Sequence, residues 1–207
     1  MTGLRLLLKS RRSLLLAALL VTVAVITRLA GGQRFLIGEQ EPVPLPWAAV
    51  LPTVSAYAVA ATAMSSMPLV EHQAARRIAG IQAAYLLAAA VIGAAFVAWG
   101  AAPLTGDVAV VGALRNYLGL LGLSLLGCAV LDAGLGWALP LSCLGTGVVA
   151  GGARVHTVLL DWLIRPGGDP PAAWFASALL LAGAGLFLSP RLRRRQAVTA
   201  GRVAEGP

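Results

Sequence analysis

Three short stretches contain residue types that perform chemistry, and each lacks part of the pattern that its chemistry requires. Residues 3–10, GLRLLLKS, have the spacing of a phosphate-binding loop, but Leu8 stands where the second glycine belongs, and no strand is expected before them. Residues 71–76, EHQAAR, keep part of an intramembrane protease motif without its second Glu. Ser124 lacks the closing glycine of a serine nucleophile elbow. The sequence therefore predicts that the chain is not an enzyme and binds no cofactor.

The histidines and cysteines are equally unpromising as ligands or nucleophiles. His72 and His156 lie in different connecting segments, on opposite sides of the membrane in the orientation derived below, so they cannot share one site. Cys128 and Cys143 both lie in apolar stretches, where thiols are unreactive. We expect no metal site and no disulfide.

The elements that carry these residues are transmembrane helices. Of the 207 residues, 58% are hydrophobic and 12% are charged, with a mean hydropathy of +0.83, whereas soluble domains carry about 25% charged residues. Six apolar stretches of roughly 17–21 residues can cross a hydrocarbon core of about 30 Å: 13–31, 47–66, 80–100, 116–132, 134–152 and 172–189. The sequence predicts an all-α, polytopic integral membrane protein with six transmembrane helices. A count of five stays open, because only Asp132–Gly134 separates the fourth and fifth stretches.

Positive charges predict the orientation of these spans. The chain carries 16 Lys and Arg against 8 Asp and Glu, a net charge of +8, and loops rich in Lys and Arg stay in the cytoplasm. With the N-terminus inside, eleven cations are inner and five are outer; the outer ones are Arg28, Arg34, Arg115, Arg154 and Arg165. We therefore expect both termini to be cytoplasmic. The positive charge is assigned to the lipid bilayer and not to nucleic acid.

The chain is accordingly divided into three parts. Residues 1–12 form a basic amphipathic cytoplasmic N-terminus, either an interfacial helix or a charged topogenic end. Residues 13–189 form the six-helix transmembrane domain, and its first stretch, at about 18 residues, is longer than a signal-peptide core, so we expect a retained anchor. Residues 190–207 form an Arg-rich cytoplasmic tail that is predicted to be disordered.

Two connecting segments show helix signals. In 67–80, Glu71 lies in the first turn, Arg76 and Arg77 in the last, and Gly80 can end the helix. This cytoplasmic helix either docks a partner protein or simply extends the third span. In the outer segment 153–171, Asp161 can pair with Arg165 at i,i+4, and the segment is predicted to be interfacial or partly re-entrant, with Trp162 at headgroup level.

Other features concern the interior of the spans. Pro52 and Pro140 are expected to kink the second and fifth helices, and Gly119, Gly122 and Gly127 permit close helix contact in the fourth. Ionisable residues occur only near span ends, whereas ion-coupled carriers place them at mid-membrane. Any uphill transport would therefore need energy from another subunit.

The whole pattern resembles an export-type ABC transporter permease of the ABC type-2 superfamily. The resemblance rests on the basic amphipathic start, six spans, a cytoplasmic helix after the second span and an amphipathic outer segment before the sixth. The stretches 114–127, LRNYLGLLGLSLLG, and 162–166, WLIRP, leading to Ala173–Trp174, resemble small permease-like membrane proteins of actinobacteria. The preference for Arg over Lys and the abundance of Ala and Gly also fit a GC-rich bacterial genome.

The resemblance implies a permease in the bacterial cytoplasmic membrane that is energised by a separate cytoplasmic ATP-binding subunit. The permease would pair with a second permease as a homo- or heterodimer. It implies that the 67–80 helix couples to the ATPase, which assigns that role to Glu71, Arg76 and Arg77. The chain is short for this family. The alternative is a non-transport integral membrane protein with a structural or assembly role.

Overall fold

The structure, a computed structural model, describes residues 13–30, 34–37, 43–64, 78–104, 110–131, 134–152 and 161–189. Helices dominate these ranges: α2 (Ser13–Ala30), α3 (Trp47–Ala63), α5 (Ile78–Ala101), α6 (Val110–Val130), α7 (Ala138–Gly152) and α9 (Pro170–Phe187). The predicted N-terminal segment 1–12 and tail 190–207 lie outside the described residues. The domain between them is helical, as expected for an all-α protein.

One short β-hairpin departs from the all-helical expectation. Strand β1 (Arg34–Ile37) pairs antiparallel with β2 (Val43–Pro46), with Arg34 opposite Pro46 and Ile37 opposite Val43. Strand β2 leads directly into α3 at Trp47. The sequence does not predict this hairpin, because two four-residue strands are too short for an alternating pattern to be recognised.

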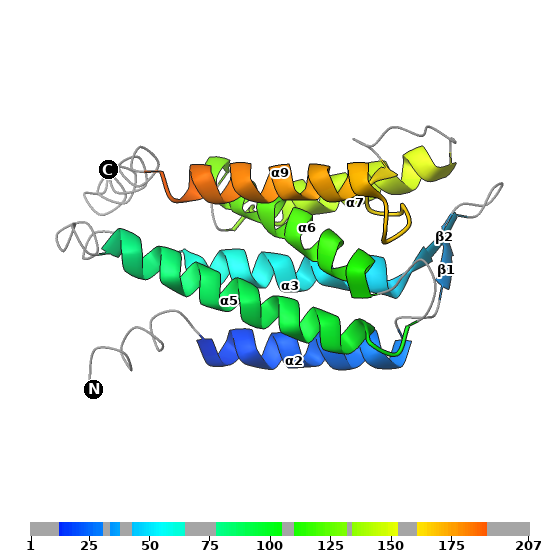
Figure 1. Cartoon of the computed structure of the whole chain (residues 1–207), viewed down its shortest axis with the longest axis horizontal. Coiled ribbons are helices and arrows are strands. Elements are labelled where there is room, and N and C mark those ends of the chain that lie inside the picture. Colours follow the sequence, from blue (N-terminus) through cyan, green and yellow to red (C-terminus); the bar gives the residue numbers. More distant parts are fainter. Residues whose placement is uncertain are drawn as a thin grey trace, which may run out of the picture.

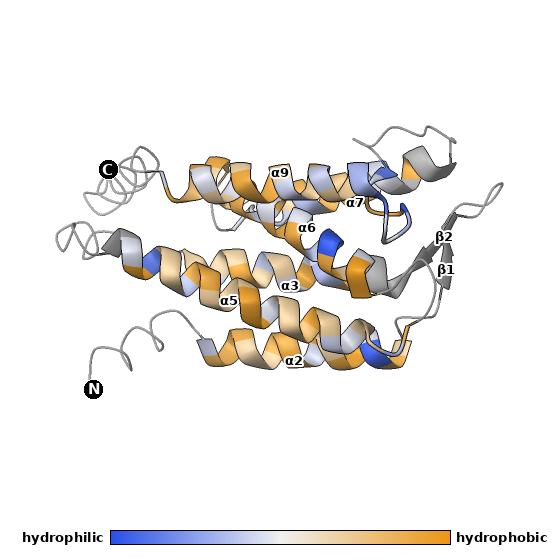
Figure 2. Cartoon of the chain, viewed as in Figure 1, coloured by the Kyte–Doolittle hydropathy of each residue, from blue (hydrophilic) through white to orange (hydrophobic). Residues whose placement is uncertain are grey.

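The helices lie along one long axis and alternate in direction in chain order (Figure 1). The start of α2 and the end of α9 are at one end of the bundle, which we call the N-terminal end. The hairpin, the starts of α3, α6 and α9, and the ends of α2, α5 and α7 are at the other, which we call the hairpin end. Figure 2 shows apolar residues along the helices and hydrophilic ones mainly near their ends.

Four of the described helices are long and apolar enough to cross a membrane: Ser13–Ala30, Gly80–Ala101, Val110–Val130 and Pro170–Phe187. They correspond to the predicted first, third, fourth and sixth spans. The predicted second and fifth spans are shorter helices, since α3 has 17 residues and α7 has 15. The fold is thus that of a multi-pass membrane protein with four candidate spanning helices in its described part.

The helix boundaries differ from the predicted ones in the second half of the chain. Helix α6 begins at Val110, so Arg115 lies inside the helix and not just before it. Helix α7 begins at Ala138, after a turn through 134–137, and Pro140 therefore lies in its first turn. The N–H that proline lacks would have no intrahelical partner there, so the predicted kink at Pro140 is wrong. Pro52, by contrast, lies inside α3.

Helix α6 forms the centre of the bundle and contacts α3, α5, α7 and α9. In its spanning window 72% of residues are buried, against 22–28% in the other three. The predicted glycines are its contact points. A Cβ on Gly122 would meet the backbone of Leu179, and one on Gly127 would meet the backbone of Gly136. Small residues thus let α9 and the turn before α7 pack directly on the α6 backbone.

Candidate functional site

The residues predicted to couple to a partner, Glu71, Arg76 and Arg77, lie outside the described residues. The structure does place the helix ends on either side of them. Gln82 Nε2 of α5 donates a hydrogen bond of 3.4 Å to the carbonyl oxygen of Ala63 at the end of α3. Both ends belong to the N-terminal end of the bundle (Figure 1). The segment between them therefore connects two helix termini that are held next to each other.

Within the described residues, the most elaborate polar arrangement lies at the hairpin end. It joins α6 to residues 161–169, which lead into α9 and which we call the strap. Arg115 Nη1 donates to the carbonyl oxygen of Pro166 at 2.7 Å, and its Nη2 donates to that of Arg165 at 2.9 Å. Asn116 Nδ2 donates to the carbonyl oxygen of Leu163 at 2.8 Å. Two adjacent α6 side chains thus bind three backbone carbonyls of the strap.

Arg115 and Asn116 also bind each other. Arg115 Nε and Nη2 lie 3.2 and 3.1 Å from Asn116 Oδ1, so the amide oxygen accepts from the guanidinium while the amide nitrogen reaches the strap. Arg115 is 6% exposed and Asn116 is 4% exposed. A buried cation needs such partners because the loss of its water is otherwise costly. The usual partner of a buried arginine is a carboxylate. Here the backbone carbonyl oxygens of the strap accept the hydrogen bonds of the Arg115 guanidinium instead.

The charges of the strap pair among themselves. Arg165 Nε contacts Asp161 Oδ1 at 2.7 Å, and Arg165 Nη1 contacts Asp169 Oδ2 at 3.3 Å. The predicted Asp161–Arg165 pair is therefore confirmed. Its hydrogen bond with Asp161 raises the pKa of the Arg165 guanidinium above its ordinary value, with a further contribution from Asp169. With Arg115, the cluster holds two cations and two carboxylates, so it is neutral overall.

Asp169 has a second role as the N-cap of α9. Its Oδ2 accepts a hydrogen bond from the backbone N–H of Ala172 at 3.2 Å, and prolines occupy the first positions of the helix. Asp169 is not among the residues predicted above, although an Asp before Pro at the first helical position is a recognisable helix start. The sequence does not indicate the contacts of Arg115 and Asn116, since nothing local links these residues to a segment about 50 positions later.

Trp162 holds the strap on its apolar side. Its side chain is 0% exposed, rests on Gly119, where a Cβ would meet the indole ring, and packs edge-to-face on Phe175 with centroids 5.9 Å apart. Trp162 is therefore enclosed by the protein, and its position at headgroup level stays a prediction. The absence of a side chain at Gly119 leaves room for the ring inside the protein.

The described residues offer little for catalysis. They contain no group of three or more His, Cys, Asp or Glu that could hold a metal ion. Cys128 and Cys143 are not joined in a disulfide, and His72 and His156 lie outside the described ranges. Hydrogen bonds to carbonyls and to an amide occupy most of the donors of Arg115. The hydrogen bonds of this cluster attach the strap to α6.

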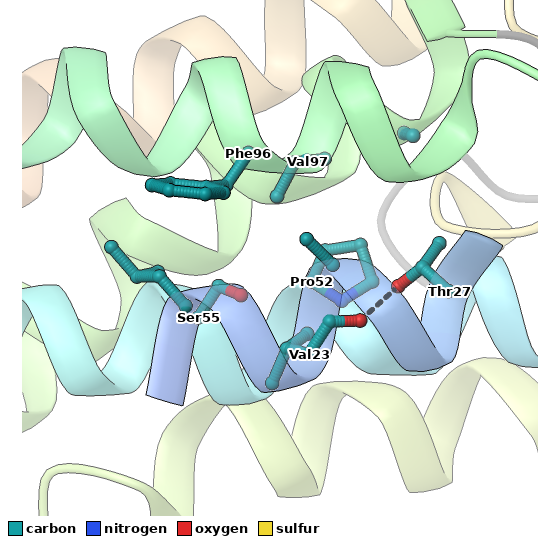
Figure 3. A pocket seen from close by; sticks show the side chains of 9 residues that line it. Val23, Thr27, Pro52, Ser55, Phe96 and Val97 are labelled. Atoms are coloured by element: carbon teal, nitrogen blue, oxygen red, sulfur yellow. Dashed lines mark hydrogen bonds between the residues drawn. The ribbon is translucent and has the colours of Figure 1, made fainter. Parts of the chain in front are cut away.

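A small gap lies between α2, α3, α5 and α6, with Thr27, Pro52, Ser55, Phe96 and Val97 around it (Figure 3). It leaves no room for a water molecule. The Thr27 hydroxyl at its edge donates to the carbonyl oxygen of Val23 in its own helix at 2.8 Å. This part of the interior is therefore closed to water.

Comparison with known proteins provides no family for this arrangement. No protein-family model matches the chain, and no curated protein or solved structure is significantly similar to it.

Proposed function

We propose that the chain is the membrane-spanning permease subunit of an ABC-type exporter and is energised by a separate cytoplasmic ATPase. The observation that carries this proposal is the alternation along one axis of the six helices in the described part of the chain, with the end of α3 beside the start of α5 at the N-terminal end. This arrangement presents residues 65–77, which hold Glu71, Arg76 and Arg77, as a connection between neighbouring helices. The resemblance in sequence assigns ATPase coupling to that connection.

The proposal includes six membrane crossings, with both termini in the cytoplasm of a bacterial plasma membrane. At 1.5 Å per residue, α3 and α7 are about 25 and 22 Å long, short of a hydrocarbon core of about 30 Å. Flanking residues and local thinning of the bilayer can make up such a difference at modest cost. The cations of the sequence favour this orientation, because Arg28, Arg115 and Arg165 belong to the hairpin end, whereas the larger basic set adjoins in sequence the start of α2, the start of α5 and the end of α9.

The packing around α6 supports a cargo path between two permeases and not through one. Tyr117, Leu120, Leu121 and Leu125 of this helix lie in the hydrophobic core, its buried charge Arg115 is held by hydrogen bonds near the hairpin end, and the gap beside the helix admits no water. A path would then form between two six-helix units, as a homo- or heterodimer. Because ionisable residues lie only near the ends of the predicted spans, such a path would be largely uncharged along the membrane, which favours bulky or amphipathic cargo.

Copurification with an ATPase tests the proposal. The tagged chain, extracted from its native membrane in mild detergent, is expected to bring down a protein that hydrolyses ATP. The combination Glu71→Ala, Arg76→Ala and Arg77→Ala should abolish that association while the chain still inserts. Arg194→Ala with Arg195→Ala removes two positive charges from the same proposed side and serves as the control, with ATPase association retained.

The closed interior favours a second candidate, an integral membrane protein with a structural or assembly role. In that case the triple variant would associate with its partners as the unaltered chain does, and no ATPase would copurify. That result would remove the coupling role of Glu71, Arg76 and Arg77. Glu71→Gln removes the negative charge and keeps the shape of the side chain. If Glu71 acts only at the N-terminus of the predicted helix, this change should cost about 0.3–1 kcal/mol of helix stability and leave ATPase association intact, whereas loss of a charge contact should weaken that association.

A further inference from the structure

Arg28 and Trp99 form a cation–aromatic contact at the hairpin end, where α2 and α5 both finish. The guanidinium carbon of Arg28 lies 4.9 Å from the centroid of the Trp99 ring, and Arg28 Nη1 donates to the carbonyl oxygen of Trp99 at 3.2 Å. Trp99 lies in the last turn of α5, where backbone carbonyls have no donor within the helix. The ring and the carbonyl together hold the Arg28 side chain in place.

Close packing of α2 on α5 positions this pair. A Cβ on Gly100 would meet the backbone of Ala24 and the side chain of Thr27, so the absence of a side chain at Gly100 lets the two helices approach each other. Both helices run toward the hairpin end (Figure 1). Arg28 and Trp99 are each two residues before the last residue of their helix, so they lie at the same level along the bundle.

The positive charge of Arg28 is exposed, and it has no carboxylate partner among the residues that the structure describes. The carboxylates of those residues belong to Asp161 and Asp169, and both pair with Arg165. A guanidinium has five N–H donors, and the contact with the Trp99 carbonyl uses one of them. The other donors are available to an anion, and binding one costs little further freedom because the side chain is already held.

An apolar surface of α2 and α5 continues from this charge toward the middle of the bundle. Val21, seven residues before Arg28, is 45% exposed, and Ile92, seven residues before Trp99, is 51% exposed. Seven residues make nearly two helical turns, so each pair shares a face and is separated by about 10 Å along the axis. Both helices are long and apolar enough to cross a membrane. A charge followed by exposed apolar side chains matches the order of headgroup and acyl chain in a phospholipid.

We propose that Arg28 and Trp99 bind the headgroup of an anionic phospholipid whose acyl chain lies along Val21 and Ile92. The Arg28 guanidinium donates charge-assisted hydrogen bonds to the phosphate oxygens, and the Trp99 indole lies at headgroup level. A zwitterionic headgroup carries a cation that repels Arg28, so an anionic headgroup is preferred. The inference depends on insertion of α2 and α5 in a bilayer. It does not depend on transport, on an ATPase or on the side of the membrane that the hairpin end faces.

Tryptophan fluorescence of the full chain in lipid vesicles tests this site. Phosphatidylglycerol or phosphatidylcholine with brominated acyl chains is mixed into unlabelled phosphatidylcholine, and quenching by the two brominated lipids is compared. The difference between the unaltered chain and Trp99→Phe isolates the signal of Trp99. At Trp99 we expect phosphatidylglycerol to bind about three- to fivefold more strongly than phosphatidylcholine, and the preference should fall at high salt because an exposed ion pair is screened.

Two substitutions and one matched tryptophan make the test specific. Arg28→Met removes the charge and should reduce the preference at Trp99 to about one. Arg28→Lys keeps the charge without the planar fork of donors, so about half of the preference should remain. Trp174, in the first turns of α9, is 77% exposed at the same end, and no described cation lies over its ring. Its signal, isolated with Trp174→Phe, should show a preference of about one.

The site is overturned if Trp99 shows no preference, if Arg28→Met leaves the preference intact, or if Trp174 shows the same preference as Trp99. Inorganic phosphate in the buffer should leave the preference unchanged, and its loss would show a site for a free anion and not for a lipid. If Arg28→Met yields no folded protein, the comparison of Trp99 with Trp174 in the unaltered chain decides. Since the purified chain is used, failure of ATPase copurification does not affect this result.

Discussion

At the scale of single residues, Arg115 shows how a charge can lie inside an apolar bundle. Four hydrogen bonds leave its guanidinium, and a hydrogen bond to a charged group contributes about 1.5–3 kcal/mol. Removing a charged group from water costs several kcal/mol. The two terms are of similar size, so the position is tolerable only because the strap provides carbonyl oxygens at that place. Leu at the same position would leave those oxygens unpaired.

Two glycines of α9, two residues apart, provide a residue-scale prediction. A Cβ on Gly183 would meet the backbone of Gly122, whereas one on Gly185 would meet nothing within 4 Å. Gly183→Ala should therefore separate α6 from α9 and lower the free energy of unfolding by about 1–3 kcal/mol. Gly185→Ala should leave it unchanged or raise it by up to about 1 kcal/mol, because alanine favours a helix.

Thermal unfolding of the purified chain in detergent measures both effects. Equal melting temperatures for the two variants would contradict the close approach of α6 and α9. Gly122→Ala, whose Cβ would meet the Leu179 backbone, should repeat the loss seen for Gly183→Ala.

At the scale of elements, α7 is the shortest of the helices in the described part of the chain. It has 15 residues and packs mainly on α6, with smaller contacts to α3 and β2. Its flanking segments lie at opposite ends of the bundle, the 134–137 turn at the N-terminal end and the strap at the hairpin end (Figure 1). Whether the chain crosses the membrane six times depends on this short helix and on α3.

Labelling from two sides of the membrane tests the crossing by α7. Leu135 precedes the helix and is 49% exposed, and Ile164 follows it and is 37% exposed. In a background with Cys128→Ala and Cys143→Ala, Ile164→Cys should react with an impermeant maleimide in intact cells. Leu135→Cys should react only after the membrane is permeabilised. Reaction of both positions from the same side would show that α7 does not cross and would favour a smaller span count.

At the scale of the whole molecule, the alternation of helix direction determines which segments share a side. The start of α2, the end of α3, the start of α5 and the end of α9 all belong to the N-terminal end. The basic residues at 5–12, 76–77 and 191–202 are neighbours of these points in the sequence. By the positive-inside rule, this pattern favours the cytoplasmic location proposed above for this end.

Reporter fusions test that assignment. A fusion at Ala200 should report a cytoplasmic location, and one at Asp107, between α5 and α6, should report the opposite side. The physical reason is the cost of moving the larger basic set across the membrane. An outside signal at Ala200, or an inside signal at Asp107, would contradict the proposed orientation.

Much of the fold follows from hydropathy alone. The four helices that can span a membrane begin and end within a few residues of the predicted stretches, except at Val110, because an apolar run of this length in lipid must satisfy its backbone as a helix. The Asp161–Arg165 pair was also predictable, since both residues lie on one helical turn. The sequence also predicted that the glycines of α6 permit close helix contact. It did not predict which segments they contact, namely α9 and the turn before α7.

The sequence by itself therefore determined the class of the protein, the rough extent of its apolar helices and the charge pattern that orients them, because these depend on residues close together in the chain. Only the tertiary structure decided that α6 is central, that Trp162 is buried on Gly119, and that Arg115 and Asn116 bind the strap. These contacts join residues about 50 positions apart. Which residues meet in these contacts depends on how the helices pack together, and no local pattern in the sequence predicts that.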